Sequence, residues 1–430
     1  MTSGPFESFS SEGRARDRLL IIAVLVSMPL VAFPRFGPLK AIDFALVLLT
    51  VRSFGSSRFV IPSQIVAITA LVGLWTAVAF FGGNLRNLHQ IGDWSVGLES
   101  MVGYPFVAAF RICTAAIGMY ELIRLSLRDR VWVSKAASYT LISVTTVSIL
   151  LWLTGPGRDV EGRPKGTFTE RGPFSRYLIA MCALVLFLQI RRRIPFSIYF
   201  AVALAASTGA LSGALLLGFF GGVYVAREAR RRLHFASVAP VMVALVFLGA
   251  LAPIASPLIM QKVASLRRAR EAQLGGNGRY AALLIVEPVV RSAPWIGYGT
   301  GSYIFVRDSE EFGLHLARIP HDNADVPVIE LLVDHGLLGG GVFLALLLVG
   351  PFRRIRRGNW PWFALLCASL LTGTTVTYLL WLAFAMAMQR GDADATVRAR
   401  SHRVLAISPG PVALDLPVRE FEAASRVISE

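Results

Sequence analysis

The residue types best suited to chemistry lie in the last third of the chain. Arg279 precedes a glycine-rich stretch with Gly297, Gly299 and Gly301, and His321 follows that stretch. An arginine can hold an anion, and an imidazole can accept a proton near neutral pH. The glycines are expected to shape a tight turn or, alternatively, to let the backbone cradle a phosphate. Together these residues predict a site that binds an anion and moves a proton.

Acidic side chains near His321 offer alternatives for the proton acceptor. Asp322, Asp325 and Glu330 follow it, up to the start of an apolar segment, and each could act as the base or orient His321. The further arginines that could bind an anion are Arg291, Arg171 and Arg176. His335 lies inside the apolar segment, where a buried histidine with a satisfied hydrogen bond is the expected state.

The sequence predicts neither a metal centre nor a cofactor. Its three cysteines each fall in an apolar block, its six histidines are scattered, and it contains no CxxC or HExxH motif. Structural metal sites need closely spaced Cys and His ligands. A disulfide framework is also not expected.

The composition is that of a membrane protein. Of 430 residues, 54% are hydrophobic and only 16% are charged, whereas soluble domains are roughly 25% charged. The net charge of +16 comes mainly from basic clusters in short loops between apolar blocks. Membrane orientation explains such clusters better than nucleic-acid binding does.

We predict an all-α, polytopic protein with about 12 transmembrane helices, several of them shorter than the ~20 residues of a straight span. The predicted spans are Leu19–Phe33, Leu39–Val51, Ile61–Phe81, Met101–Ile123, Ala136–Leu153, Tyr177–Ile190, Ile194–Ala206, Gly209–Ala226, Ser237–Met260 and Val326–Phe352, with two more dividing Trp360–Met388. The transmembrane domain then covers 19–390. A segment 1–18 precedes it, and a tail 391–430, expected to be disordered, follows it.

Basic clusters set the predicted orientation. Four of them follow even-numbered spans: Arg124, Arg128, Arg130 and Lys135; Arg191–Arg193; Arg227 and Arg230–Arg232; and Arg353, Arg354, Arg356 and Arg357. By the positive-inside rule this face and both termini are cytoplasmic. Two long segments, 154–176 and 261–325, then lie outside. The second, between spans nine and ten, is expected to be ordered and partly helical.

The spacing of the motifs resembles one bacterial family. The run Pro294-Trp295-Ile296-Gly297-Tyr298-Gly299-Thr300-Gly301-Ser302-Tyr303 lies between Arg279 and His321, and Asp334-His335-Gly336-Leu337-Leu338-Gly339 follows. This order is similar to that of the O-antigen ligase and polymerase superfamily, whose members carry it in and after a large outer loop. Gly166-Thr167-Phe168 with Arg171 and Pro173 resembles the family's earlier outer loop.

The chain departs from the family pattern at two places. Many members have Ser-Arg-Gly-Ala where this chain has Leu211-Ser212-Gly213-Ala214, so one arginine is missing. The spacing from His321 to Gly336 is also longer than usual by roughly one helical turn. The first departure concerns an arginine that binds the donor in other members. The second leaves open whether His321 or an acidic neighbour stands at the position of the family's histidine.

The resemblance implies an enzyme of the cytoplasmic (inner) membrane that acts without a metal at the outer face. Its donor would be a polyprenyl-pyrophosphate-linked oligosaccharide, and its acceptor a glycan or a lipid. Fixed guanidinium groups would hold the leaving pyrophosphate, and a base would take the acceptor's proton. Membrane lipids and other polysaccharide assembly proteins are implied partners, and nucleic acid is not.

Several functions stay open on the sequence. Polymerisation of surface or exopolysaccharide repeat units is favoured, and a ligase that joins the glycan to a lipid or another acceptor fits the same motifs. A transporter of a lipid-linked or anionic substrate is the alternative of another class. The missing arginine also fits an inactive scaffold.

Overall fold

The structure is a computed structural model of the chain. It describes residues 11–30, 39–55, 61–81, 98–158, 162–168, 171–189, 195–208, 218, 221–222, 286, 288–307, 309, 326–355, 359–372, 375 and 377–389. The chain divides into two compact units, Met1–Arg390 and Gly391–Glu430, and all described residues belong to the first. The predicted tail therefore lies outside the described residues. The predicted span Ser237–Met260 also lies outside them. The same holds for the predicted span Gly209–Ala226, apart from residues 218, 221 and 222.

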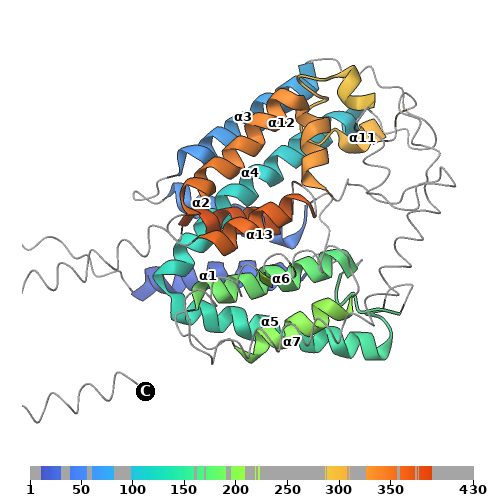
Figure 1. Cartoon of the computed structure of the whole chain (residues 1–430). Coiled ribbons are helices and arrows are strands. Elements are labelled where there is room, and N and C mark those ends of the chain that lie inside the picture. Colours follow the sequence, from blue (N-terminus) through green and yellow to red (C-terminus); the bar gives the residue numbers. More distant parts are fainter. Residues whose placement is uncertain are drawn as a thin grey trace, which may run out of the picture. The chain divides into compact units, whose positions relative to one another are not determined.

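Four helices form the N-terminal part of the described fold, which contains helices and no strand (Figure 1). They are α1 (Ser11–Ser27), α2 (Ala41–Phe54), α3 (Ser63–Phe81) and α4 (Leu98–Arg128). α1 packs on α2, and both α2 and α3 pack on α4. At the start of α2 the carboxylate of Asp43 accepts a hydrogen bond from the amide of Lys40 at 2.7 Å, which satisfies a donor that the helix itself leaves free.

The first helix is longer than predicted. α1 begins at Ser11 rather than at Leu19, so Arg14, Arg16 and Arg18 lie within it. Arginine has a high helix propensity, and its charged head can reach water while the helix continues. The polar end of a helix can therefore extend beyond the apolar block that marks a span.

A second group consists of α5 (Arg130–Thr154), α6 (Arg171–Leu188) and α7 (Phe196–Ser207), in which each helix packs on the other two. α6 begins at Arg171 rather than at the predicted Tyr177. Arg171 and Arg176, which the prediction places in the outer segment 154–176, are therefore both helical, and the outer position of that segment stays a prediction. Pro173 allows the early start, since proline is tolerated in the first turn of a helix.

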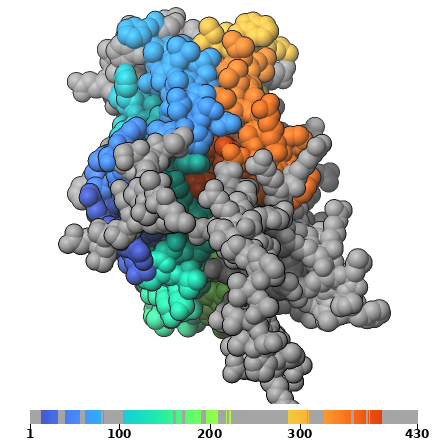
Figure 2. All heavy atoms as spheres, turned by 90° about the vertical axis from the view of Figure 1, so that its left-hand side faces the viewer, coloured from blue at the N-terminus to red at the C-terminus, as the bar shows by residue number. Residues whose placement is uncertain are grey.

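The C-terminal part contains α11 (Tyr303–Arg307), α12 (Pro327–Arg353), α13 (Trp360–Leu370) and a final helix over 378–389. The segment Trp360–Met388 thus holds two short helices, as its length predicted. α12 packs on α3, α11 and α13. Figure 2 shows α3 in blue beside α12 in orange, with the yellow residues that precede α11 at their upper end.

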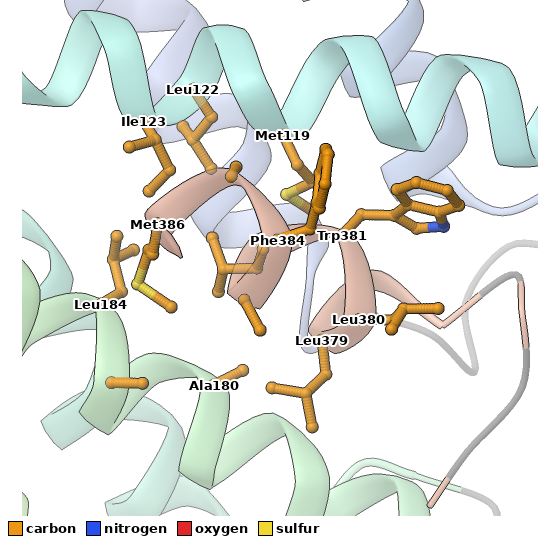
Figure 3. Close-up of a cluster of buried hydrophobic side chains, with 14 of the residues drawn as sticks. Met119, Leu122, Ile123, Ala180, Leu184, Leu379, Leu380, Trp381, Phe384 and Met386 are labelled. Atoms are coloured by element: carbon orange, nitrogen blue, oxygen red, sulfur yellow. The ribbon is translucent and has the colours of Figure 1, made fainter. Parts of the chain in front are cut away.

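The final helix 378–389 is the centre of the core. Its residues from Leu379 to Gln389 are all buried, and Figure 3 shows its side chains between those of α4, such as Met119 and Leu122, and those of α6, such as Leu184. A helix that is apolar on every side must be surrounded by protein or lipid. The protein supplies that surrounding here, so this short helix joins the two groups of helices.

Three described helices are long and apolar enough to cross a membrane. They are the segments Gly103–Arg128, Arg130–Thr154 and Pro327–Arg353, and shorter apolar helices accompany them. Together with the 54% hydrophobic composition, they show a helical membrane protein. The total of about 12 spans stays a prediction.

Side-chain contacts show that the basic helix ends lie together at one end of the described helix bundle. The joining pairs are Arg18 with Asp129, Arg52 with Asp17, Gln389 with the carbonyl of Tyr120, and Arg354 with the carbonyl of Met388. The opposite ends meet through Trp75 with Ile296, Thr167 with Pro29, and Thr375 with Glu330. The glycine-rich stretch therefore lies at the end opposite to the described basic clusters (Figure 1).

Candidate functional site

α12 is interrupted at Gly336. This residue has φ 64° and ψ −170°, which is not helical, although helix continues on both sides of it. Such a backbone conformation is essentially restricted to glycine. The interruption prevents the helical hydrogen bonds that Leu337 and Leu338 would donate to Val333 and Asp334, so two carbonyls and two amides need other partners.

The glycine-rich stretch supplies those partners. The amides of Tyr298 and Gly299 donate to the carbonyls of Val333 and Asp334 at 3.0 and 2.6 Å. In return, the amides of Leu337 and Leu338 donate to the carbonyls of Pro294 and Trp295 at 2.8 and 3.2 Å. Four backbone hydrogen bonds thus replace two helical ones. We call the residues 294–303 with the break in α12 the glycine junction.

Glycines permit the close approach that the junction needs. A Cβ added to Gly297 would lie 2.5 Å from the amide nitrogen of Gly336, and one added to Gly336 would lie 2.6 Å from the carbonyl carbon of Trp295. Gly297, Gly299 and Gly301 all have positive φ, at 71°, 102° and 75°. No other residue type satisfies both the backbone conformation and the space at Gly297 and Gly336.

The carboxylate of Asp334 holds the second half of the glycine-rich stretch. Its Oδ2 accepts a hydrogen bond from the amide of Gly301 at 2.7 Å, and its Oδ1 accepts from the amide of Tyr303 at 2.9 Å and from the Ser302 hydroxyl at 3.1 Å. The side chain is buried. These amides face a carboxylate, which would repel an anionic ligand. The alternative that this stretch cradles a phosphate is therefore not favoured.

Trp75 ties α3 to both sides of the junction. Its indole Nε1 donates to the carbonyl of Ile296 at 2.7 Å and to that of His335 at 3.1 Å. The indole packs against Gly339, where an added Cβ would clash with it. His335 is fully buried, as predicted for this position, and its Nε2 lies 3.3 Å from the Thr300 hydroxyl.

A small apolar cluster surrounds the junction. It is built from Val289, Tyr298, Tyr303, Phe305, Val306, Ile329 and Val333, with Tyr104 and Val326 among the residues packed against it. The ring of Tyr104 from α4 meets that of Phe305 edge-on at 5.8 Å. This cluster is separate from the main core, so the junction has its own hydrophobic support.

Both halves of the junction fall within one matched segment of the chain. Residues 194–344 match the family described as O-antigen ligase. The match confirms the resemblance predicted from the motifs, and we call this segment the O-antigen ligase domain. A comparison with curated proteins finds no match to the chain. The family implies that the protein handles glycans in the assembly of surface polysaccharides.

Within the O-antigen ligase domain, the structure describes two of the predicted reactive side chains. Arg291 is exposed in the helical segment that leads into the junction. Glu330 is buried in the first turn of α12, where its Oε2 accepts hydrogen bonds from the amide and hydroxyl of Thr375 at 2.7 and 3.0 Å. Arg279, His321 and Asp325 lie outside the described residues, and their roles stay predictions.

The predicted arginines of the earlier outer segment lie outside the O-antigen ligase domain. Arg171 is the first residue of α6, and Arg176 is buried one turn further on. The loop before them packs closely: Phe168 is buried, and the Thr167 hydroxyl donates to the carbonyl of Pro29 at 2.9 Å. This loop anchors α6, which sets where both arginines stand.

From the sequence, Asp334 and Gly336 were part of the family motif without a role of their own, and Trp75 was not identified as part of the site. For Asp334 a signal was present, since an acidic residue inside an apolar helix is costly and needs a partner. For Gly336 the motif gave no sign of a helix break, because helices tolerate single glycines. Among the described residues, no group of three His, Cys, Asp or Glu side chains is placed to hold a metal ion.

Proposed function

We propose that this protein transfers glycan repeat units from a polyprenyl-pyrophosphate carrier at the outer face of the cytoplasmic membrane. Polymerisation of surface or exopolysaccharide repeat units is the favoured reaction, and ligation of the carrier-linked glycan to a lipid or another acceptor is the alternative. The observation that carries the proposal is the glycine junction. It joins the two motifs of the O-antigen ligase domain into one structure.

Under this proposal, the two chain segments that the reaction needs both lead to the glycine junction. On one side the chain arrives from Arg279 through Arg291, whose guanidinium groups would hold the donor pyrophosphate. On the other side α12 begins at Pro327, directly after His321 and Asp325. Val326 packs against the same apolar cluster as Tyr298. In this proposal the donor-binding segment and the base-carrying segment therefore both end at the apolar cluster of the glycine junction.

Arg279 is the first donor contact to test, with Arg291, Arg171 and Arg176 as further candidates. Loss of one charge-assisted contact from a dry site typically lowers the rate by about 10²–10³. We expect this loss for Arg279→Ala, and partial activity for Arg279→Lys, which keeps the charge without the planar fork. An Arg279→Ala protein that folds normally and turns over at the wild-type rate would remove Arg279 from the site.

His321 is the proposed general base, with Asp325 as the alternative. Glu330 is less suited to this role, because its Oε2 already holds Thr375 in a buried contact. We expect His321→Ala to lower transfer by about 10²–10⁴ while donor binding survives. If Asp325→Asn abolishes transfer and His321→Ala does not, the carboxylate is the base.

Deletion of the gene separates the two reactions. A strain without a polymerase should keep single repeat units on the carrier or on the cell surface, whereas one without a ligase should accumulate long carrier-linked glycan. Glycan sizing together with analysis of lipid-linked intermediates reads out both. Normal glycan length and normal carrier-linked pools in the deletion strain would contradict the proposed function.

One observation favours transport as a second candidate. Arg111 and Asp43 form a buried ion pair at 3.2 Å within the helices, and charges inside a membrane segment often mark a substrate path. However, Asp43 also accepts hydrogen bonds from Tyr378 at 2.8 Å and from the amide of Lys40 at 2.7 Å. This saturation fits an anchor better than a moving ion site. A transporter mutant would retain its substrate inside the cell.

The proposed orientation has both termini in the cytoplasm and the glycine junction outside. Trp295 is exposed at the junction, and Arg353 is exposed at the opposite end of α12. In a cysteine-free background, a membrane-impermeant thiol reagent applied to intact cells should label Trp295→Cys and spare Arg353→Cys. The reverse pattern would invert the topology.

A further inference from the structure

The carboxyl group of Asp334 lies where two parts of the O-antigen ligase domain meet. It belongs to α12, and its three hydrogen-bond donors, the amides of Gly301 and Tyr303 and the hydroxyl of Ser302, all belong to the glycine-rich stretch. Its own carbonyl oxygen accepts from Gly299 at 2.6 Å. One residue of α12 therefore contacts four residues of that stretch.

We propose that Asp334 is a positioning residue that sets how the outer loop sits on α12. Its side chain makes no contact with a reacting group in this proposal. It fixes on α12 the half of the stretch that continues through α11 toward His321 and Asp325 in the sequence, whereas the backbone bonds hold the half that leads back to Arg291 and Arg279. The inference rests on the proposed function for its catalytic consequence, but its structural part can be tested separately.

The chemistry of a carboxylate explains why Asp334 can set the position of the outer loop on α12. A carboxylate only accepts hydrogen bonds, and it offers two oxygens that can serve several donors at once. An asparagine of the same shape would turn an NH₂ group toward at least one of the three donors. In Asp334→Asn the NH₂ group faces either the amide of Gly301 or the amide of Tyr303 and the Ser302 hydroxyl, so one or two of the three contacts are lost and a backbone amide is opposed, without creating a cavity. An aspartate without these donors would be a buried polar group without partners, so the loop and the helix depend on each other.

The backbone bonds alone leave part of the loop unsecured. They hold residues 294–299 to the break in α12, whereas the carboxylate of Asp334 accepts the hydrogen bonds from Gly301–Tyr303, where Tyr303 also packs in the apolar cluster. α11 begins at Tyr303, so the same contacts fix the start of that helix. Loss of the carboxylate should therefore loosen the second half of the stretch and leave the first half attached.

The positioning role predicts a rate effect. A misplacement of about 1 Å between reacting groups can lower a rate by about 100-fold. We expect Asp334→Asn to lower the maximal transfer rate, counted per folded molecule, by about 10- to 100-fold. The affinity for the donor should change little, since the arginines remain in place within their own segment.

A distance measurement tests the structural part without any activity. Spin labels at Ile296 and Val349, both about half exposed, would report the position of the loop on α12 in a background without the three native cysteines. Val349 lies well below the junction: Leu337, directly after the helix break, is about 18 Å from Val349 along the axis of α12, at 1.5 Å per residue. A second pair at Ile304→Cys and Val349→Cys samples the half held by Asp334, because Ile304 directly follows Tyr303 and is only partly buried. The wild type should give narrow distributions for both pairs, and Asp334→Asn should broaden the second.

Glu121→Gln is the matched control. Glu121 is a fully buried carboxylate that pairs with Arg124 at 2.5 Å, near the opposite end of α4. Its loss should lower stability as the loss of any buried pair does, yet leave both distance distributions narrow. Broadening in both variants, or in neither, would overturn the positioning role.

A wild-type protein inactive in every transfer assay would refute the proposed function, whereas a narrow second distribution in Asp334→Asn would refute the positioning role.

Discussion

Two buried carboxylates in this protein are held in different ways. Asp43 has a cation beside it: Arg111 lies at 3.2 Å and also contacts the hydroxyl of Tyr378 at 3.3 Å. Asp334 is held by amides and a hydroxyl instead. The first group connects α2, α4 and the final helix, whereas the second connects a loop to a broken helix.

The difference teaches how each region is stabilised. An ion pair among long packed helices has few ways to relax, so removal of Arg111 leaves the buried Asp43 charge without a counter-charge, although Tyr378 and the amide of Lys40 still donate to it. A loop held by neutral donors can instead detach, and its amides can then bind water. The Asp43 group should therefore govern the stability of the fold, and the glycine junction should govern the geometry of the site.

The largest loss of stability is expected for Arg111→Ala. Breaking a buried ion pair from one side typically costs about 3–5 kcal/mol in the free energy of unfolding. Because removing both charges leaves neither one buried without a partner, the double variant Asp43→Asn with Arg111→Ala should lose much less than the sum of the single variants Asp43→Asn and Arg111→Ala. Unfolding in mixed micelles measures all three proteins. If the double variant lost as much unfolding free energy as the two single variants together, the pair would not act as a unit.

A loss of about 3 kcal/mol is expected for Gly336→Ala, from the backbone conformation and the overpacking together. The new Cβ would lie 2.6 Å from the carbonyl carbon of Trp295. Gly341→Ala is the control, since nothing lies within 4 Å of its added Cβ. Transfer should fail in the first variant and persist in the second. An active, stable Gly336→Ala protein would contradict the described break.

Trp75→Phe should cost about 1–2 kcal/mol, since it removes two hydrogen bonds to carbonyls but keeps an aromatic ring. The same measurement on Trp295→Phe, at a side chain that is 66% exposed, should show almost no change. If the two substitutions cost the same, the indole of Trp75 does not secure the junction.

The smallest effect is expected for Thr375→Val, at about 1 kcal/mol, because the hydroxyl bond to Glu330 is lost while the amide bond remains. Thr375→Ser keeps the hydroxyl and serves as the control. Equal unfolding free energies for the valine variant and the wild type would show that Glu330 is held by the backbone alone. Transfer activity should survive in both, because Glu330 is not the proposed base.

The sequence predicted the helical membrane fold because long apolar blocks and basic loops report it directly. Helix ends were less accurate, as at Arg171, because a helix can continue past its apolar block into polar residues. The division of Trp360–Met388 was predicted from length alone. Its burial on every side was not predicted, because apolar residues that face lipid and those that face protein look alike in sequence.

For the site, the sequence identified the two motifs but not how they fit together. The bonds of Tyr298 and Gly299 to the carbonyls of Val333 and Asp334 are backbone contacts, which carry no residue signature. The break at Gly336 exists only because the loop supplies the missing partners. Such a mutual dependence between distant segments appears only in three dimensions.

The most direct test of the account is transfer by the purified protein in lipid nanodiscs. Polyprenyl-pyrophosphate-linked glycan and an acceptor would be supplied, and both the free polyprenyl pyrophosphate and the extended glycan would be measured by mass spectrometry. The wild type should release one carrier for each glycan joined, and His321→Ala and Arg279→Ala should each reduce both products in parallel. An intact donor in the presence of folded wild-type protein, or carrier release without glycan joining, would contradict the proposed reaction.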